Sequence, residues 1–356
     1  MKSPLLSANP ESHKSPQPQQ PVSDLRGRHL RDLRLSVTDH CNLRCSYCLP
    51  QEIFGENFPF THKNELLSLK EMTRLAGIFV SLGVQKIRIT GGEPLLRKDV
   101  SELIQHLRKK HPDTDLALTT NGIFLAAQAQ RLFDAGLSRI NVSSDSLDSE
   151  IARKIAGQHS NPEKVWQGIE TARQLGMEVK VNAVIQRGIN ETQILPLALR
   201  CRELGAKLRF IEFMDVGTCN HWDKSKVITG AEVQTRLAKH FDFLPEPPAY
   251  SGEVASRFRY ADGKGEIGFI NSISKPFCGE CTRIRISAEG KLYTCLFAGT
   301  GFDLKSAIRQ ENFSDKDLAD LVKNIWGQRN DRYSEERSTQ TKTTTPSKTE
   351  MWRLGG

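Results

Sequence analysis

The sequence predicts an α/β fold around a parallel β-sheet, and three observations lead to this class. Between residues 33 and 214, short β-rich runs alternate with amphipathic helical stretches. Alternation of this kind is typical of βα units, in which each helix connects two parallel strands. The units number six, which is too few for a closed eight-stranded barrel. Two architectures remain open, an open partial barrel and a doubly wound sheet.

The expected strands can be read in order from their β-rich composition. They span 33–37, 86–90, 116–120, 140–144, 179–185 and 208–214, with helices at 67–83 and 100–111 among the stretches between them. In either architecture the chemistry lies at the carboxyl ends of the strands. Polar residues, sulfur-containing residues and glycines do occur there, namely Cys41, Gly91, Gly92, Glu93, Thr119, Ser143, Met214 and Asp215.

Alternation along two strands predicts basic side chains on the inner face of the sheet. Lys180 and Asn182 are two positions apart and therefore share a face, opposite apolar neighbours. Lys86, Arg88 and Thr90 share a face of the second strand in the same way. A cation on an interior face needs an anion, although the same side chains could instead reach solvent from strand edges.

Composition limits the class of protein. The chain has 356 residues and is 38% hydrophobic, so it can bury one large core or two smaller ones. No run approaches eighteen apolar residues, and the first residues lack the apolar stretch of a signal peptide. We therefore expect a cytoplasmic protein without membrane contact, whose eight cysteines serve metal or redox chemistry. The net charge of +8 fits nucleic acid, a phosphorylated small molecule or a basic solvated surface.

Three cysteines in the stretch DHCNLRCSYCLP form a first candidate metal site. Cys41, Cys45 and Cys48 have the spacing C-x3-C-x2-C, with no fourth cysteine and no histidine following closely. A structural zinc site would take four protein ligands, so this spacing disfavours zinc. A four-iron cluster held by three thiolates leaves one iron open to a small molecule.

A second set of three cysteines follows near the end of the chain. Cys278, Cys281 and Cys295 have the spacing C-x2-C-x13-C. A zinc ion completed by a distant residue is the alternative, but two incomplete triads in one chain favour a second open-iron cluster. Arg283 and Arg285 follow at strand spacing, so both guanidiniums are expected on one side, where they suit phosphate oxygens.

The motifs around these triads resemble a known family. The first triad, with Tyr47 as its aromatic residue, is similar to the signature of the radical S-adenosylmethionine superfamily. Within it, the chain resembles the GTP 3′,8-cyclase family from about residue 26 to 300 and at the terminal Gly-Gly. The matching motifs are DHCNLRCSYC, KIRITGGEPLLR, LTTNG, RFIEFMDVG and CGECTRIR.

The resemblance implies a fold, cofactors and site residues. The fold would be an incomplete (β/α)6 TIM-like barrel, with a C-terminal β-containing segment that closes the open side and carries a second cluster. Two [4Fe-4S] clusters would be held by the triads, with S-adenosylmethionine on the first and GTP on the second. The catalytic residues implied are Cys41, Cys45, Cys48, Arg283 and Arg285. The cofactor contacts implied are Tyr47, Gly92, Glu93, Ser143 and Met214. The GTP contacts implied are Arg34, Lys86, Arg88, Thr119, Lys180, Arg283, Arg285 and, through its backbone, Ile284.

The implied activity is the conversion of GTP to (8S)-3′,8-cyclo-7,8-dihydroguanosine 5′-triphosphate, the first step of molybdenum cofactor biosynthesis. A 5′-deoxyadenosyl radical would take hydrogen from C3′ of the ribose, and the carbon radical would attack C8 of guanine. The partners implied are a reductant such as flavodoxin or ferredoxin, the downstream cyclic pyranopterin monophosphate synthase and a second copy in a homodimer, with no nucleic acid. The alternative is another radical S-adenosylmethionine enzyme that acts on tRNA or a peptide.

Composition and resemblance together divide the chain into segments. Residues 1–23 are rich in Pro, Ser and Gln and are expected to be a disordered extension. The partial barrel is expected over 24–245, and a region that binds a cluster and substrate over 246–327. A polar, flexible linker at 328–350 would lead to a di-glycine tail at 351–356.

Overall fold

The computed structural model describes residues 21–55, 57–337 and 348–355, whose strands form one mixed sheet. The strands are β1 Asp32–Ser36, β2 Lys86–Thr90, β3 Asp115–Thr120, β4 Arg139–Ser143, β5 Glu178–Ile185, β6 Lys207–Glu212, β7 Phe243–Glu246, β8 Ser256–Tyr260, β9 Glu266–Ile270, β10 Arg283–Ile286, β11 Lys291–Tyr293 and β12 Phe302–Asp303. The six strands expected from the sequence correspond to β1 to β6, with small differences at their ends.

The order of strands in the sheet is β12-β11-β10-β1-β2-β3-β4-β5-β6-β9-β8-β7. All neighbours from β10 through β1 and β6 to β9 pair in parallel. The outer strands on both sides pair antiparallel. The predicted α/β class is therefore confirmed, and the sequential order of β1 to β6 excludes a doubly wound sheet, in which the order reverses.

The helices lie between successive strands and near the end of the chain. They are α1 Leu69–Ser81, α2 Val100–Lys110, α3 Leu125–Asp134, α4 Ser149–Ala156, α5 Pro162–Gln174, α6 Ile194–Leu204, α7 Gly230–Leu237, α8 Leu304–Arg309, α9 Asp315–Gly327, α10 Tyr333–Glu336 and α11 Met351–Leu354. Local sequence fixes their ends. Ser68 and Glu71 form a capping box at the start of α1, and Gly205 ends α6 in a left-handed conformation.

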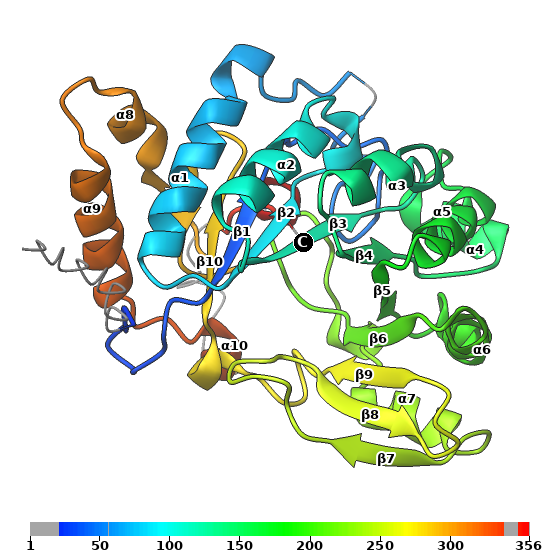
Figure 1. Cartoon of the computed structure of the whole chain (residues 1–356). Coiled ribbons are helices and arrows are strands. Elements are labelled where there is room, and N and C mark those ends of the chain that lie inside the picture. Colours follow the sequence, from blue (N-terminus) through cyan, green and yellow to red (C-terminus); the bar gives the residue numbers. More distant parts are fainter. Residues whose placement is uncertain (1–20, 56, 338–347, 356) are drawn as a thin grey trace, which may run out of the picture.

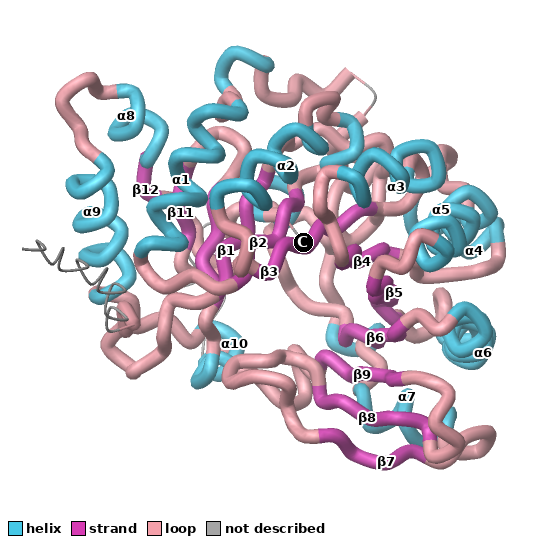
Figure 2. Tube along the Cα trace, viewed as in Figure 1, coloured by secondary structure: helices cyan, strands magenta, loops and turns pink. Residues whose placement is uncertain are grey.

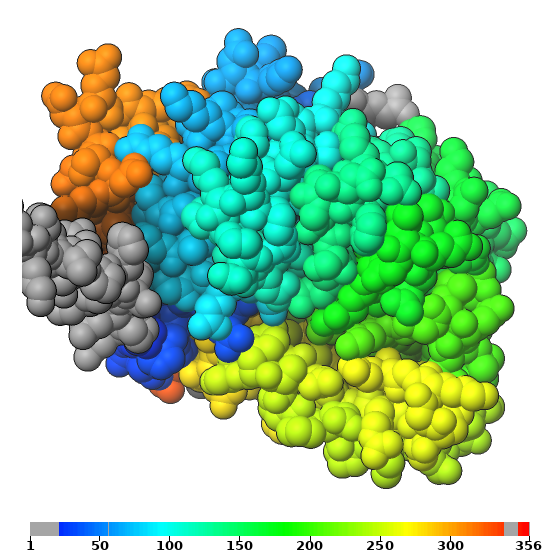
Figure 3. Space-filling view, in the orientation of Figure 1, coloured from blue at the N-terminus to red at the C-terminus, as the bar shows by residue number. Residues whose placement is uncertain are grey.

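The strands lie along an arc with the helices outside it. Figure 1 shows α1 to α6 on the outer side of β1 to β6, and Figure 2 shows the same arrangement by secondary structure. The helix α11 lies on the inner side of this arc, near β1 and β2. On the face shown in Figure 3, residues of the outer helices and of β7 to β9 form the surface, and the red tail is not seen. The arc therefore has an outer layer of helices and an inner side that meets the end of the chain.

The outer face of the sheet forms the main hydrophobic core. In β5, the alternate residues Val179, Val181 and Ala183 are buried there with the apolar faces of the helices. The opposite residues, Lys180 and Asn182, are only partly buried. The inner face is thus more polar, as the alternation predicts. None of the helices within the described ranges is both long and apolar enough to cross a membrane.

Residues near the two ends of the described chain pack together. The backbone N–H of Leu25 donates to the carbonyl of Arg329 at 3.2 Å, and the Trp326 indole N–H donates to the carbonyl of Arg28 at 3.0 Å. Arg329 is buried, with 4% of its surface exposed. The predicted flexible linker is therefore wrong for residues 328–337, which are charged but belong to the packed fold. Of the disordered extension predicted over 1–23, residues 1–20 lie outside the described residues, as do the linker residues 338–347, whereas Val22 accepts a backbone hydrogen bond from Leu30.

Candidate active site

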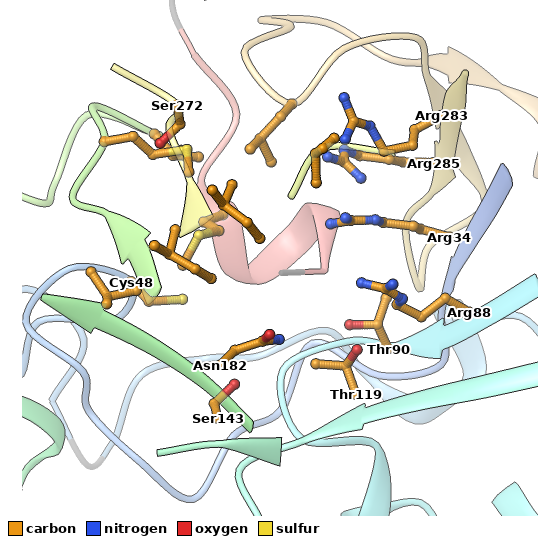
Figure 4. A pocket seen from close by; sticks show the side chains of 18 of the residues that line it. Arg34, Cys48, Arg88, Thr90, Thr119, Ser143, Asn182, Ser272, Arg283 and Arg285 are labelled. Carbon is orange, nitrogen blue, oxygen red and sulfur yellow. The ribbon is translucent and has the colours of Figure 1, made fainter. Parts of the chain in front are cut away.

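One cavity on the inner side of the sheet brings together most of the residues expected at the site. It has a volume of about 320 Å³. Its walls include both cysteine triads, Cys41, Cys45, Cys48, Cys278, Cys281 and Cys295. They also include Arg34, Lys86, Arg88, Thr119, Arg283 and Arg285, together with Tyr47, Gly92, Ser143 and Met214. Figure 4 shows the guanidiniums of four arginines pointing into the cavity from one side, with Cys48 on the opposite side.

The first triad lies in the loop that follows β1. The Cys48 N–H donates to the carbonyl of Cys45 at 2.9 Å, which forms a tight turn between two of the cysteines. The Arg44 guanidinium donates to the carbonyls of Cys41 and Phe54 and so ties the loop to the segment after it. Burial and the carboxylate of Glu93 raise the pKa of Cys41 to about 11. Burial and the other thiols of the triad also raise the pKa of Cys45.

The glycines after β2 allow two backbone segments to approach each other. A side chain at Gly91 would place its Cβ 2.3 Å from the carbonyl oxygen of Thr38, and one at Gly92 would lie 2.3 Å from that of His40. The Gly92 and Glu93 N–H groups donate to the same two carbonyls, at 2.8 and 2.7 Å. The glycines thus bring the end of β2 against the start of the first cysteine loop.

Glu93 does not line the cavity, although the sequence places it with the cofactor contacts. Its carboxylate accepts hydrogen bonds from the N–H of Leu95 at 2.9 Å, the Thr120 hydroxyl at 2.7 Å and the N–H of Asn121 at 2.7 Å. The side chain is fully buried, and burial raises the pKa of Glu93 to about 7. Glu93 therefore joins the ends of β2 and β3 behind the cavity wall.

Tyr47 and Asp145 form a buried pair beside the first triad. The Tyr47 hydroxyl donates to Asp145 Oδ2 at 2.7 Å, while Asp145 Oδ1 accepts the N–H of Val184 at 2.8 Å. Burial raises the pKa of Asp145 to about 6. Both residues line the cavity, so a carboxylate lies near the first triad with no arginine or lysine ion-paired to it among the described residues.

The second triad lies among arginines. Arg283 Nη2 donates to the sulfur of Cys281 at 3.0 Å, and Arg329 Nη1 donates to the Cys281 carbonyl at 2.7 Å. Burial opposes ionisation of Cys281, but these two guanidiniums lower its pKa to about 6. Burial raises the pKa of Cys295 to about 12. The second triad therefore has a positive side at Cys281.

Three arginines stand side by side on the strands that border this triad. Arg34 of β1 is in register with Arg285 of β10 on one side and with Arg88 of β2 on the other. Burial and the neighbouring Arg285 and Arg88 lower the pKa of Arg34. Among the described residues, none of the three arginines has a carboxylate within ion-pair distance. Adjacent, unpaired cations in a cavity create a strong site for an anion.

Lys180 lines a different cavity, of about 250 Å³, at the amino-terminal ends of the strands. Its ammonium lies 2.8 Å from Glu178, with which it forms an ion pair. Lys86, Arg209 and Tyr250 line both cavities, and Lys86 donates to the Tyr250 hydroxyl at 3.0 Å. Lys180 thus faces inward as predicted but lies farther from the cysteines than the other predicted GTP contacts.

Ile284 is the third predicted contact whose side chain lies away from the cavity. It is fully buried in the hydrophobic core on the opposite face of β10 from Arg283 and Arg285. Only its backbone is on the sheet between the two arginines. The expectation of a backbone contact is compatible with this position.

Several cavity residues were not assigned from the sequence. Arg209 follows the same alternation in β6 that identified Lys180 in β5, so the strand pattern could have found it. Asp145 comes directly after a strand and offered a similar signal. Tyr250 and Arg329 lie in irregular or polar segments, and no local pattern marks them.

The donor set can be tested against the groups that the sequence suggests. All eight cysteines are free thiols, and six of them line one cavity. The His, Cys, Asp and Glu side chains of the described residues form no group of three or more that could hold a single metal ion. A four-iron cluster takes one thiolate on each of several irons, so its ligands stand farther apart than those of one ion. Two sets of three thiols around one cavity fit such clusters.

Comparisons with known proteins identify the family of the chain. Residues 35–201 match the family model of the radical SAM superfamily, and residues 206–335 match that of Molybdenum Cofactor Synthesis C. The chain is 48% identical over 321 residues to "GTP 3′,8-cyclase" of Staphylococcus aureus strain MRSA252, covering 90% of this chain and 94% of the relative. The protein of the same name from strain JH9 matches with the same values.

Two solved structures are similar in fold. Streptococcus suis SuiB bound to precursor peptide SuiA has a TM-score of 0.62 at 16% identity, with 89% of this chain and 69% of that chain covered. SuiB bound to S-adenosylmethionine has a TM-score of 0.58 at 16% identity, with 89% and 70% covered. At this identity the likeness concerns the fold alone.

Proposed function

The chain belongs to the GTP 3′,8-cyclase family of the radical SAM superfamily, and from this membership we propose that it converts GTP to (8S)-3′,8-cyclo-7,8-dihydroguanosine 5′-triphosphate. This reaction is the first step of molybdenum cofactor biosynthesis. The observation that carries the proposal is one cavity whose walls hold both cysteine triads and a row of arginines that have no carboxylate partner among the described residues. Few other functions require two open metal sites and a polyanion site together.

The two triads are proposed to hold two [4Fe-4S] clusters, Cys41, Cys45 and Cys48 the first and Cys278, Cys281 and Cys295 the second. The first cluster, when reduced, would supply the electron that cleaves S-adenosylmethionine into methionine and the 5′-deoxyadenosyl radical, which would remove hydrogen from C3′ of the GTP ribose. S-adenosylmethionine is a cation, and the carboxylate of Asp145 beside the first triad suits it better than the arginine side does. Tyr47, Gly92, Ser143 and Met214 complete the proposed cofactor wall.

The arginines are proposed to bind the triphosphate. Arg34, Arg88 and Arg285 are in register across three neighbouring strands, so their guanidiniums form a rigid row that matches several phosphate oxygens at once. The Nη1 atom of Arg285 is buried without a hydrogen-bond partner among the described residues, as is the Thr119 hydroxyl. Each is therefore free to bond a substrate atom. Fixing the triphosphate on one wall orients the ribose toward the first triad, and this orientation lowers the entropic part of the barrier.

Lys86 and Lys180 are proposed to reach the far end of the triphosphate. Lys86 lines both cavities and Lys180 only the second, so both lie on the path away from the cysteines. Lys180 is released from Glu178 at the cost of one ion pair when it binds a phosphate. Arg209 also lines both cavities and is a further cation available to the phosphates.

The proposal extends to architecture and partners. We propose that the open arc of strands forms the incomplete (β/α)6 barrel expected for the family and that residues 246–327 are the segment that carries the second cluster. A reductant such as flavodoxin or ferredoxin would supply electrons, and cyclic pyranopterin monophosphate synthase would consume the product. A homodimer is expected as well.

An anaerobic assay tests the proposal directly. The reconstituted and reduced protein is incubated with S-adenosylmethionine and GTP, and the products are separated by chromatography and mass spectrometry. We expect 5′-deoxyadenosine together with a cyclised nucleotide of unchanged mass relative to GTP. ATP in place of GTP serves as the control. Formation of 5′-deoxyadenosine without any cyclised GTP would contradict the proposed activity.

A further inference from the structure

A buried group of charged residues beside the second triad joins the segment before β1 to the segment after α9. We call Asp24, Arg28, Arg329 and Asp331 the arginine clamp. Arg28 Nε lies 2.5 Å from Asp24 Oδ2, and Arg329 Nε lies 3.0 Å from Asp331 Oδ2. The side chains of Asp24, Arg28 and Arg329 are each at most 1% exposed, whereas Asp331 is 28% exposed.

Each arginine of the clamp binds the backbone of one cysteine of the triad. Arg28 Nη1 donates to the Cys278 carbonyl at 2.9 Å, and Arg329 Nη1 donates to the Cys281 carbonyl at 2.7 Å. Arg28 also donates to the carbonyl of Asp331 at 2.8 Å. The loop of the second triad is therefore held by residues that are distant in sequence. Arg28 lies 250 positions from Cys278, and Arg329 lies 48 positions from Cys281.

Packing fixes the guanidiniums in place. The Trp326 ring lies under Arg329, with the guanidinium carbon 4.5 Å from the ring centroid, and its indole N–H donates to the Arg28 carbonyl. A buried arginine that makes several charge-assisted hydrogen bonds has little freedom to move. Its guanidinium is thus kept at a constant place against the cysteine loop, although Asp24 and Asp331 pair with it and offset part of its charge.

We propose that Arg28 and Arg329 position the second triad and that their charge raises the reduction potential of the cluster it holds above that of the first cluster. This inference rests on the proposed second cluster. A fixed positive charge favours the reduced, more negative form of a cluster, and hydrogen bonds and net charge are among the factors that set such potentials. Among the described residues, one arginine, Arg44, donates to a backbone carbonyl of the first triad, that of Cys41, and the carboxylate of Asp145 lies near this triad.

The test is a redox titration of the complete reconstituted protein, followed by electron paramagnetic resonance. The two clusters are told apart because S-adenosylmethionine changes the signal of the first and GTP that of the second. For Arg329→Gln we expect the ratio of reduced to oxidised second cluster at a fixed potential to fall about tenfold, a shift of about 59 mV for one electron. The first cluster should not shift.

Three further variants make the test decisive. Asp331→Asn removes a negative charge and should shift the second cluster in the opposite direction, whether or not Arg329→Gln retains its iron. Arg329→Lys keeps the charge and should restore most of the potential. Arg74→Gln is the matched control, because Arg74 also binds an aspartate and two carbonyls but joins α1 to the α8–α9 region. It should leave both potentials unchanged.

The outcomes separate this inference from the proposed function. An unaltered protein with about four irons, or with no signal that responds to GTP, would overturn the second cluster itself. If both clusters are present but Arg329→Gln and Asp331→Asn leave the second potential where it was, or shift both clusters alike, the role of the clamp is wrong.

Discussion

The two cysteine triads line the same cavity but lie in opposite electrostatic surroundings. Around the first, burial and the carboxylate of Glu93 raise the pKa of Cys41 although Arg44 opposes them, and Asp145 is a further nearby carboxylate. At the second, Arg283 and Arg329 bond Cys281 directly and lower its pKa, despite burial. The two sites therefore offer three thiols each as metal ligands, in different electrostatic surroundings.

This difference matches the ligands proposed for each site. A cationic sulfonium compound suits the side with a carboxylate and no arginine row, and a triphosphate suits the side with Arg34, Arg88 and Arg285. A single cavity can thus hold two charged molecules in a defined order, because each end attracts one sign of charge. Under this proposal, the cysteine spacing determines the metal group of each site, and the charged side chains of the neighbouring strands determine which small molecule binds there.

The largest expected effect comes from removing one triad at a time. Cys45→Ser should abolish both 5′-deoxyadenosine and the cyclised nucleotide, since the first triad binds the cofactor. Cys281→Ser should retain S-adenosylmethionine cleavage but abolish cyclisation. Each variant should lose about half of the iron. Iron analysis and product chromatography measure both effects.

Cys201→Ala provides the control for that experiment. Cys201 is buried in α6, in the hydrophobic core, and does not line the cavity. Its substitution should leave the iron content unchanged. A Cys281→Ser protein with the full iron content, or one that still cyclises GTP, would remove the distinction between the triads.

A smaller effect is expected from the arginine row. Arg285→Gln removes a charged donor from a buried phosphate site, at a cost of about 1.5–3 kcal/mol, so GTP should bind about 10 to 150 times more weakly. Affinity for S-adenosylmethionine should not change. Anaerobic calorimetry on the reconstituted protein measures both affinities.

Arg173→Gln is a matched control for the arginine row. Arg173 binds the carbonyls of Leu204 and Met177 outside the cavity, so its loss should not affect GTP. Equal weakening of both ligands by Arg285→Gln would show that the row does not serve the triphosphate alone.

Removal of Trp352, which belongs to an aromatic cluster next to the first triad, should have a still smaller effect that is confined to the first cluster. Trp352 lies edge-on to Phe54, Phe58 and Phe60, with each pair of ring centroids 5.8 Å apart. Cys41 and Cys48 pack against the same cluster. Trp352→Ala removes about 3–5 kcal/mol of packing, enough to release the tail, so air should destroy the first cluster several-fold faster than in the unaltered protein.

Trp352→Phe preserves an aromatic ring and should protect the first cluster nearly as well as tryptophan. The second cluster should decay at the same rate in all three proteins. Its bleaching can be followed by visible absorbance and paramagnetic resonance. Equal acceleration at both clusters would mean that the tail covers the whole cavity rather than the first triad.

The smallest effect is expected for Glu71, which lies away from both triads and contributes only to the stability of the fold. Although burial opposes it, hydrogen bonds from Arg309 and Ser68 lower the pKa of Glu71 from 4.5 to about 2. A lowered pKa stabilises the fold above about pH 4.5, and this stabilisation is lost as the pH falls through about 2. Since the pair is at the surface, Glu71→Gln should cost less than about 1 kcal/mol at pH 7.

Urea unfolding of the metal-free protein at several pH values measures this difference. The gap between Glu71→Gln and the unaltered protein should narrow as the solution is acidified below about pH 4.5. The iron content at pH 7 should be equal in both. A gap that widens in acid would reverse the sign assigned to this carboxylate.

Local patterns in the sequence were sufficient for the parallel strands and for both triads. The alternation in β2 and β5 identified the inward positions of Arg88 and Lys180, because successive side chains of a strand must point to opposite faces. The alternation could not predict that Lys180 lines the second cavity. Which cavity a side chain lines depends on its position along the strand and on Tyr250, which comes from a distant loop.

Residues 328–337 show why other features could not be predicted. Their charge and lack of apolar anchors are typical of a flexible linker. Arg329 is nevertheless buried, because Asp24 and the carbonyl of Cys281 satisfy its charge and donors from other parts of the chain. Glu93 is a similar case. The resemblance assigns its carboxylate to the cofactor, but in the structure this carboxylate accepts three hydrogen bonds from neighbouring segments of the protein.

The sequence by itself determined the repeating βα units, the two sets of three cysteines and the arginines at strand spacing, since each depends only on residues close together in the chain. The tertiary structure alone decided that β10 pairs with β1, which sets Arg285 beside Arg34 and brings the second triad to the cavity of the first. Arg34 and Arg285 are paired although some 250 residues separate them in the chain. Such pairing depends on the burial and hydrogen bonding of the whole sheet, and therefore no local sequence pattern encodes it.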